Sequence, residues 1–344
     1  DMNELSEAVG RLFVEGVPIA WENIQQGAKW RPVTLPTYPF QRSRFWIENG
    51  ARKAGPPNNT PDDGSLVGEQ SDPNVPIFRT KLSIDRHPWL AEHTVHGSAL
   101  VAGPVYLCLA VEAAERAFGT QGWSVQNFEI STPLRPHPDA LQVETRLTAQ
   151  PDGRVTFSIY SRTETNESDT LWAQHATGIL TKSTEALPEK AEVFETMIAG
   201  LNPENLAESH ISKLQSLGIE LTGRFRTLER LHKKNADVVA RIALPVGTKP
   251  LATSFSDPSL LDGVLQAAGA ALPEKNDGGD SLYFLTAIES ISLTAYIPSP
   301  LWCRAKLRVS GNGRSKIVDA FIHDEAGNCI GAVKGIVLTR ADMT

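Results

Sequence analysis

Most of the chain alternates apolar and polar residues in short runs, and two longer apolar runs interrupt this alternation. In RVTFSIYSR, Val155, Phe157 and Ile159 alternate with Thr156 and Ser158, which is the two-residue period of a strand with one buried face. Comparable runs predict strands over 123–131, 140–149, 154–162, 171–180, 224–234, 236–244, 281–297, 301–310 and, as two strands joined by an Asp-Glu-Ala-Gly turn, 316–341.

The two longer apolar runs predict helices that are buried on nearly all sides. The first spans 104–118, where Pro104 suits the first turn and Gly119 a left-handed stop. The second begins after Asp257, a natural N-cap that is followed by Pro258, and reads SLLDGVLQAAGAAL. Each helix stands among predicted strands in its own half of the chain. We therefore predict an α+β fold in which a layout of one sheet around one helix occurs twice.

The beginning of the chain has a different composition from the rest. A helix is predicted over 4–16, and the prolines of RPVTLPTYPFQRSRFW predict an extended path after it. Proline and glycine dominate the segment that follows, which is typical of a linker. We divide the chain into a tail over 1–48, a flexible linker over 49–76, a first half over 77–182, a connecting segment over 183–209 and a second half over 210–344. Because the chain starts at an aspartate, we expect it to be cut from a longer polypeptide.

Charge and cysteine content exclude several classes of protein. Lys and Arg number 33 against 40 Asp and Glu, a net charge of −7, which disfavours binding to nucleic acid or to an anionic membrane. We find no apolar run long enough to span a bilayer and no signal peptide in DMNELSEAVG. The three cysteines are too few and too far apart for a disulfide framework or a zinc knuckle. We expect a soluble protein of the reducing cytoplasm.

Histidines and an acid flank the two buried helices. His87, His93 and His96 precede the first helix, and Asp262 and Gln266 lie one turn apart on the second. Aliphatic neighbours should bury Asp262, and burial raises the pKa of a carboxyl group, so that it can donate a proton near neutral pH. Gln266 is placed to orient this acid by a hydrogen bond. A base and an acid from opposite halves could together eliminate water β to a carbonyl.

The same residues have plainer interpretations. Asp262 and Gln266 can form a purely structural hydrogen-bonded pair, and a histidine in a loop can serve packing or face solvent. The three histidines have no carboxylate or cysteine partner at a suitable spacing, so the sequence does not predict a metal site.

Two segments resemble the signatures of polyketide synthase dehydratase domains. HPWLAEHTVHGSALVAGPVYL is similar to the pattern His-x3-Gly-x4-Pro, with His93 and Gly97 in the matching places. DPSLLDGVLQ is similar to the pattern Asp-x3-Gln/His, with Asp262 and Gln266 matching. Upstream, LPTYPFQRSRFWIE resembles the tail that follows the acyltransferase domain of these synthases, so the resemblance covers essentially the whole chain. It implies a double hotdog fold, in which each half is a curved antiparallel sheet around one long helix.

The resemblance also implies an activity, the dehydration of a 3-hydroxyacyl thioester on an acyl carrier protein to the 2-enoyl thioester. His93 would be the base, Asp262 the acid and Gln266 the residue that orients the acid. The oxyanion and substrate-binding positions would be Gly97, Gly103, Pro104, Leu221 and Phe225. The substrate would lie in a tunnel between the two helices.

Partners and cofactors follow from the same resemblance. The partners would be the carrier protein domain, the neighbouring acyltransferase and ketoreductase domains and a second copy in a homodimer, with no nucleic acid or membrane. No metal or diffusible cofactor would be required, because the phosphopantetheine arm belongs to the carrier. For contact with the acidic carrier, Arg224, Arg226 and Arg230 are candidates for a basic patch at the tunnel mouth.

The chain departs from the family pattern at two places. Ala102 occupies the proline position of the first signature, although Pro104 follows closely. In a third signature, Tyr-Gly-Pro-x-Phe, only Phe225 is retained, because Leu221-Thr222-Gly223 replaces the first three residues. These departures leave two alternatives to dehydration: a double-bond isomerase or oxygen-heterocycle-forming cyclase of the same fold, and a catalytically silent scaffold domain.

Overall fold

The computed structural model describes residues 2–24, 66–72, 75–119, 121–136, 141–163, 171–182, 187, 194–202, 204–251, 253, 255–273, 281–294, 296–308 and 314–341. It divides into two units, residues 1–59 and 60–344. In the first unit, α1 (Met2–Val14) confirms the predicted helix, and a short α2 (Trp21–Ile24) follows. The ring of Phe13 packs edge-on against Trp21, with centroids 5.4 Å apart. The predicted extended segment over 31–46 lies outside the described residues.

The second unit is built on an antiparallel sheet of twelve strands. Its first six strands are β1 (Glu69–Asp72), β2 (Val75–Leu82), β5 (Trp123–Ile130), β6 (Leu141–Ala149), β7 (Val155–Thr163) and β8 (Ala173–Lys182). The other six are β10 (Leu228–Lys234), β11 (Asp237–Ile242), β12 (Tyr283–Leu293), β13 (Leu301–Leu307), β14 (Ser315–His323) and β15 (Cys329–Arg340). The strand order is β1-β2-β6-β7-β8-β5-β12-β15-β14-β13-β11-β10, so each half contributes six consecutive places. Apart from β1 and β2, the sequence predicted all of these strands.

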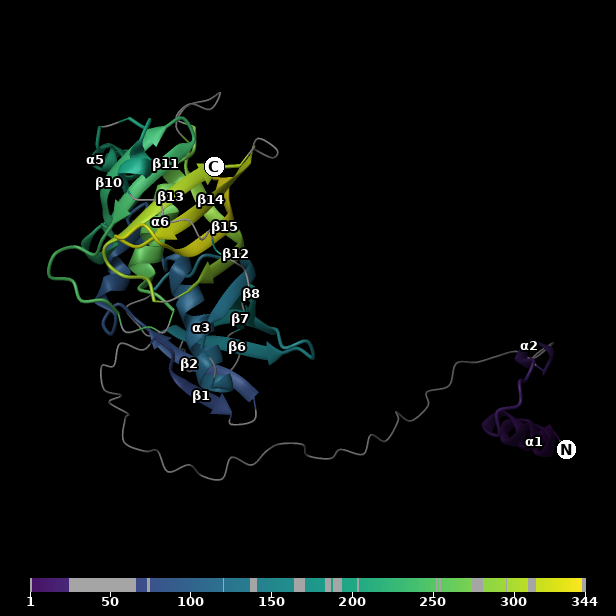
Figure 1. Ribbon diagram of the computed structural model, residues 1–344. Helices are drawn as coiled ribbons and strands as arrows, with labels where there is room; N and C mark the ends of the chain where they lie inside the picture. The colour runs from purple at the N-terminus through teal and green to yellow at the C-terminus, as the bar shows by residue number, and fades with distance from the viewer. Residues whose placement is uncertain are drawn as a thin grey trace, which may run out of the picture. The chain divides into compact units, whose positions relative to one another are not determined.

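The two halves are joined by main-chain hydrogen bonds between β5 and β12. Val125 faces Ile291 and Glu129 faces Ala287 in this antiparallel pair. The first half is drawn in blue and teal and the second in green and yellow in Figure 1, and the sheet passes from one to the other at this pair. The repeated layout was predicted from the sequence, and its fusion into one sheet was not.

Each half wraps around one buried helix, as predicted. α3 (Gly103–Phe118) packs against strands of the first half and α6 (Pro258–Ala270) against strands of the second, and the two helices contact each other (Figure 1). The left-handed conformation of Gly119, with φ 63°, ends α3, and the Asp257 carboxylate caps α6 by accepting a hydrogen bond from the Ser259 amide.

A small second sheet connects the two halves next to the helices. It consists of β3 (His93–Val95), β4 (Ser98–Ala99) and β9 (Ile219–Leu221), in the order β4-β3-β9. In this sheet, β3 of the first half pairs with β9 of the second half. The sequence did not predict these strands, because two or three residues are too few for an alternating pattern to be recognised.

Two predicted boundaries are wrong. The linker predicted over 49–76 ends too late, because Leu66 and Val67 are buried in the core and β1 pairs with β2. The connecting segment predicted over 183–209, whose sequence has helical character, contains α4 (Phe194–Ile198) and the start of α5 (Ala207–Ser216). The strand predicted over 224–234 begins as a short 3-10 helix, η2 (Gly223–Phe225), before β10.

Candidate active site

A cavity of about 1570 Å³ lies between elements of both halves. Its walls include His93 from β3 of the first half and Asp262 and Gln266 from α6 of the second. The predicted base, the predicted acid and the residue predicted to orient the acid therefore line one cavity. Apolar side chains make up most of the remaining wall, among them Leu206, Leu214, Leu217, Leu231, Leu265 and Leu285.

The ring of His93 is fixed by two contacts. Its Nδ1 lies 3.0 Å from the carbonyl oxygen of Leu100, an atom that can only accept a hydrogen bond. Nδ1 therefore carries the hydrogen, and in the neutral ring Nε2 keeps its lone pair and can accept a proton. Phe225 packs edge-on against the same ring at 5.4 Å between centroids. The neutral His93 ring thus has the tautomer of a base.

Asp262 is held as an acid. Burial in α6 raises the pKa of its carboxyl group, against smaller lowering effects of the charge on His93 and of a hydrogen bond from Gln266. The Gln266 Nε2 donates to Asp262 Oδ2 at 2.8 Å and to the carbonyl oxygen of Phe225 at 3.1 Å. Because Oδ2 accepts this hydrogen bond, Oδ1 is the oxygen free to carry the proton. The charge of His93 is close enough to Asp262 to lower the pKa of its carboxyl group.

The N-terminus of α3 opens into the same cavity. Gly103 and its N-cap Ala102 both line the wall, and Ala102 has no side-chain oxygen with which to cap the first turn. Pro104 has no N–H, and the Val105 amide donates to the carbonyl of Ala102 at 3.0 Å. The Gly103 amide is therefore the donor of this turn that can be offered to a ligand, and the helix dipole favours negative charge there. A Cβ at Gly103 would come within 2.7 Å of the Leu285 side chain, so a larger residue would not fit without displacing that wall.

The structure places the other predicted binding residues in different positions. Leu221 lines the cavity, as expected. Gly97 lies in the β3–β4 turn with φ 72°, Pro104 is buried in the first turn of α3, and neither is among the residues of the wall. Phe225 is buried behind the wall, where its ring supports His93 and its carbonyl supports Gln266. The prediction that Phe225 contacts substrate is replaced by a supporting position.

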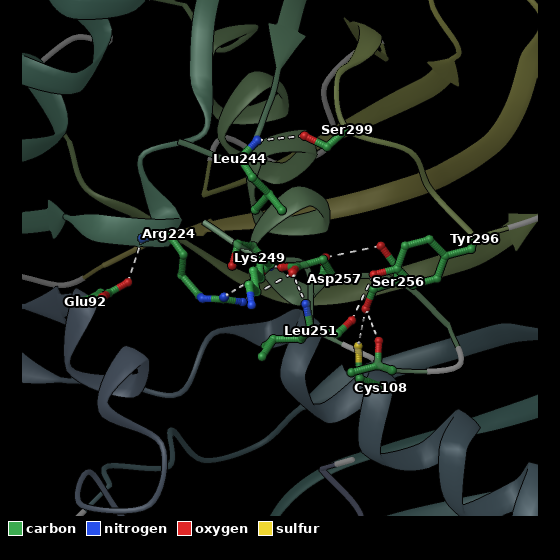
Figure 2. A network of polar contacts seen from close by, with 12 residues as sticks. Glu92, Cys108, Arg224, Leu244, Lys249, Leu251, Ser256, Asp257, Tyr296 and Ser299 are labelled. Atoms are coloured by element: carbon green, nitrogen blue, oxygen red, sulfur yellow. Dashed lines mark hydrogen bonds and ion pairs between the residues drawn. The ribbon is translucent and has the colours of Figure 1, made fainter. Parts of the chain in front are cut away.

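A polar network holds the helix that carries the acid (Figure 2). Arg224 donates from its guanidinium to the carboxylate of Asp257 at 3.2 Å and to the carbonyl oxygen of Lys249 at 3.0 Å. The Asp257 carboxylate also accepts from the Leu251 amide at 2.8 Å. The backbone amide of Arg224 in turn donates to the carboxylate of Glu92, directly before His93, at 2.6 Å. The network thus connects the segment of the base to the start of the acid's helix.

The location of Arg224 corrects one prediction. Its side chain is 9% exposed and paired with Asp257 at 0%, so it cannot belong to a basic surface patch. Arg226 is exposed, and it pairs with Glu208 at 2.6 Å. The charge of Arg224 is used inside the protein, because Asp257 would otherwise be a buried carboxylate without a counter-ion.

One wall of the cavity was missed by the sequence analysis. Residues on one face of α5 and just beyond it line the cavity: Leu206, Ser209, His210, Lys213, Leu214 and Leu217. Their spacing of three and four residues is the helical signal that could have identified this wall. This signal lies across the predicted border between the connecting segment and the second half of the chain. The polar composition there indicated a connection between the halves.

The described part of the chain contains neither a candidate metal site nor a candidate membrane-spanning helix. Within it, three or more His, Cys, Asp or Glu side chains are nowhere grouped so that they could hold a metal ion. None of the helices in these residues has both the length and the apolar composition needed to cross a membrane.

The chain is similar to polyketide synthase dehydratases over most of its length. A family described as polyketide synthase dehydratase domain matches residues 66–162, and one described as polyketide synthase dehydratase N-terminal domain matches residues 204–343. Polyketide synthase GfsE of Streptomyces halstedii is 28% identical over 340 residues, which cover 96% of this chain and 9% of that protein. The chain thus spans a small part of this relative's length.

Solved dehydratase domains share the fold. The dehydratase domain from the CurF module of the curacin polyketide synthase superposes with a TM-score of 0.69 at 21% identity, covering 81% of this chain and 99% of that one. The erythromycin dehydratase gives a TM-score of 0.62 at 24% identity, covering 78% and 92%. The similarity confirms the predicted double hotdog fold.

Proposed function

The chain belongs to the family of polyketide synthase dehydratase domains, and we propose that it converts a 3-hydroxyacyl thioester to the 2-enoyl thioester by removing water. One observation carries this proposal: His93 and Asp262 line a single cavity, where the Nδ1 of His93 bonds to the carbonyl of Leu100 and burial raises the pKa of the Asp262 carboxyl group. A base with a free lone pair and a protonated acid are the two groups that the elimination of water from a β-hydroxyl requires.

The proposed reaction balances with these two groups alone. Nε2 of His93 takes the proton from the α-carbon, and the electrons of that C–H bond form the double bond to the β-carbon. The C–O bond at the β-carbon breaks, and Asp262 gives its proton to the departing oxygen, which leaves as water. His93 is then protonated and Asp262 ionised, and transfer of a proton from the former to the latter restores both.

The thioester carbonyl gains negative charge while the α-proton is removed. We assign its stabilisation to the backbone amide of Gly103 at the start of α3. Backbone donors fixed before the reaction can stabilise such an oxyanion without rearranging. Gln266 keeps the proton of Asp262 on Oδ1 by donating to Oδ2.

We also propose where the domain acts. The substrate would be carried on the phosphopantetheine of an acyl carrier protein domain, with acyltransferase and ketoreductase domains as neighbours in the same synthase and a homodimer as the assembly. The mechanism assigned here needs no metal or diffusible cofactor. Cys108 and Cys303 are buried free thiols, which supports a reducing compartment such as the cytoplasm.

A second candidate is favoured by the positions of Ala102 and Leu221. Both are departures from the family signatures, and both line the cavity, where they contact whatever is bound. They favour a double-bond isomerase or an oxygen-heterocycle-forming cyclase as the alternative activity. Either reaction leaves the mass of the acyl chain unchanged.

Mass spectrometry of carrier-bound products separates these possibilities. The 344-residue chain is incubated with 3-hydroxyacyl-carrier substrates of both β-configurations, and we expect loss of the mass of one water molecule from one of them. A His93→Phe variant should leave the substrate intact. Lack of water loss from every stereoisomer would contradict the proposal. A new product of unchanged mass from an enoyl or hydroxy-enoyl carrier substrate would support the second candidate.

A further inference from the structure

The wall formed by α5 contains a polar site that the dehydration mechanism does not use. His210 lies on the face of α5 that lines the cavity, one turn before Lys213 and Leu214, which also line it. Lys233 reaches the same cavity from β10. A histidine and two lysines therefore face a space whose walls are otherwise largely apolar.

His210 differs from His175 and His232 in its hydrogen bonding. Its Nε2 is buried and has no hydrogen-bond partner among the described residues. By contrast, the ring of His175 bonds to Ser161 at 2.7 Å and to the carbonyl of Thr132 at 3.0 Å, and the ring of His232 bonds to the carbonyl of Asn202 at 3.1 Å. Burying a polar nitrogen without a partner is unfavourable, so such an atom indicates a place for a ligand.

The His210 ring is neutral at physiological pH. Burial and the positive charges of Lys233 and Lys213 lower its pKa to about 4, against a smaller raising effect of a hydrogen bond with the backbone of Gln266. A neutral imidazole nitrogen either donates or accepts one hydrogen bond, depending on the tautomer. A hydroxyl group can do both, so it pairs with either tautomer, whereas an alkyl group can do neither.

The hydrogen bond between His210 and the backbone of Gln266 relates the position of His210 to that of Asp262, the proposed acid. Gln266 is one helical turn from Asp262, which corresponds to about 5.4 Å along α6. Three bonds of an extended chain cover about 3.8 Å, so an acyl chain spans this distance in roughly four carbon–carbon bonds. A group that meets His210 is therefore attached a few carbons beyond the β-carbon.

We propose that His210 and the neighbouring Lys233 form a subsite for a hydroxyl group on the ζ-carbon of the acyl chain, four bonds beyond the β-carbon. The hydroxyl would pair with Nε2 of His210, while the ammonium group of Lys233, which also donates to the carbonyl of Leu272 at 2.9 Å, lies near its oxygen. This inference rests on the proposed function, since it assumes that an acyl chain occupies the cavity. It names the substrates that the domain prefers: chains that keep an oxygen beyond the one being removed.

Binding of 2-enoyl pantetheine thioesters tests the subsite without requiring turnover. Calorimetry would compare the Kd of chains of equal length with a δ-hydroxyl, with a ζ-hydroxyl and with neither. We expect the chain with the ζ-hydroxyl to bind about ten-fold tighter than the plain chain, as for one well-placed hydrogen bond. The ratio should fall to about one in His210→Leu and be partly restored in His210→Gln, whose amide can donate and accept.

His232→Leu is the matched control. His232 is another buried histidine; it directly precedes Lys233 but does not line the cavity. We expect this variant to keep the ten-fold ratio of the Kd values of the plain and hydroxylated chains. Equal affinities of all chains for the wild type, or a ratio that survives in both His210 variants, would overturn the subsite. Affinity that depends on a phosphate added to the pantetheine and not on the hydroxyl would assign the lysines to that phosphate instead. Failure of water elimination alone would contradict only the proposed function.

Discussion

His93 and Leu221 lie directly opposite each other in the antiparallel pair of β3 and β9. The pairing continues past these strands, because the Thr222 amide donates to the carbonyl of Glu92 at 2.8 Å. The base belongs to the first half of the chain, yet its backbone is hydrogen-bonded to the second half, which carries the acid. The separation of base and acid is therefore fixed by main-chain hydrogen bonds as well as by the packing of α3 on α6.

Replacing Asp262 with Asn should abolish water elimination. The amide has nearly the same shape as the carboxyl group but no acidic proton, so turnover should fall by at least about 100-fold, the lower range for a general acid. Steady-state kinetics with the 3-hydroxyacyl-carrier substrate measures this loss, and circular dichroism checks the fold. A variant that turns over at the full rate would place the acid elsewhere.

The raised pKa of Asp262 also predicts how stability depends on pH. The folded protein keeps a proton that the unfolded chain releases above the ordinary value of 3.8. The free energy of unfolding should therefore fall as pH rises from that value to the folded pKa. Above the folded pKa, this group should cause no further decrease. Asp262→Asn lacks this decline, so urea titrations from acid to neutral pH should show its stability advantage growing over that interval. A constant difference between the two proteins would contradict the raised pKa.

Removing the amide of Gln266 should weaken the acid without removing it. In Gln266→Leu, Asp262 Oδ2 and the carbonyl of Phe225 both lose a donor. Because that hydrogen bond lowers the pKa of Asp262, its loss should shift the alkaline limb of the kcat/KM profile to higher pH. We expect kcat to fall about 10- to 100-fold, the equivalent of one unsatisfied buried group. An unshifted profile would assign Gln266 a purely structural role.

The buried pair of Arg224 and Asp257 should matter for stability. Arg224→Met leaves the Asp257 carboxylate, the cap of α6, without its counter-ion, and we expect a loss of about 3–5 kcal/mol. Arg226→Met is the matched control, since that residue forms an exposed pair with Glu208 that should contribute at most about 1 kcal/mol. Chemical denaturation of the two variants gives the comparison. Equal losses would show that burial of the Arg224 pair has no special importance.

Two glycines of α6 should respond in opposite directions to the same substitution. A Cβ at Gly263 would lie 2.5 Å from the hydroxyl of Thr227 and 2.6 Å from Ile242, so Gly263→Ala should destabilise by about 1–3 kcal/mol. At Gly269 nothing lies within 4 Å, and Gly269→Ala should stabilise the helix by about 0.5–1 kcal/mol. Thermal unfolding measures both, and a destabilised Gly269 variant would argue against the open space on that side of α6.

The helices α3 and α6 and the buried position of Asp262 could be predicted from residues that lie close together in the sequence. Proline and glycine at the ends of α3, and the Asp257 cap of α6, act within a few residues, so the sequence alone locates the helix boundaries. The burial of Asp262 and its bond to Gln266 follow from helical spacing among aliphatic residues. These features depend on neighbours along the chain.

The parts that were missed depend on distant partners. β3 and β9 are three residues each and exist because they pair with each other across more than a hundred residues of chain. Arg224 resembles a surface residue until its side chain is seen beside Asp257. The helical spacing of the cavity face of α5 can be found in the sequence, but the cavity itself cannot, because residues of α6 and β10 form other parts of its wall.

Because main-chain hydrogen bonds join β5 to β12, different parts of the molecule hold the reacting groups and shape the cavity around them. The frame that holds the reacting groups is made of backbone, whereas much of the surrounding wall is made of side chains on α5 and on the loop before α3. Exchanging wall side chains leaves the frame intact. Such a scaffold can accept new acyl chains during evolution while its chemistry stays the same.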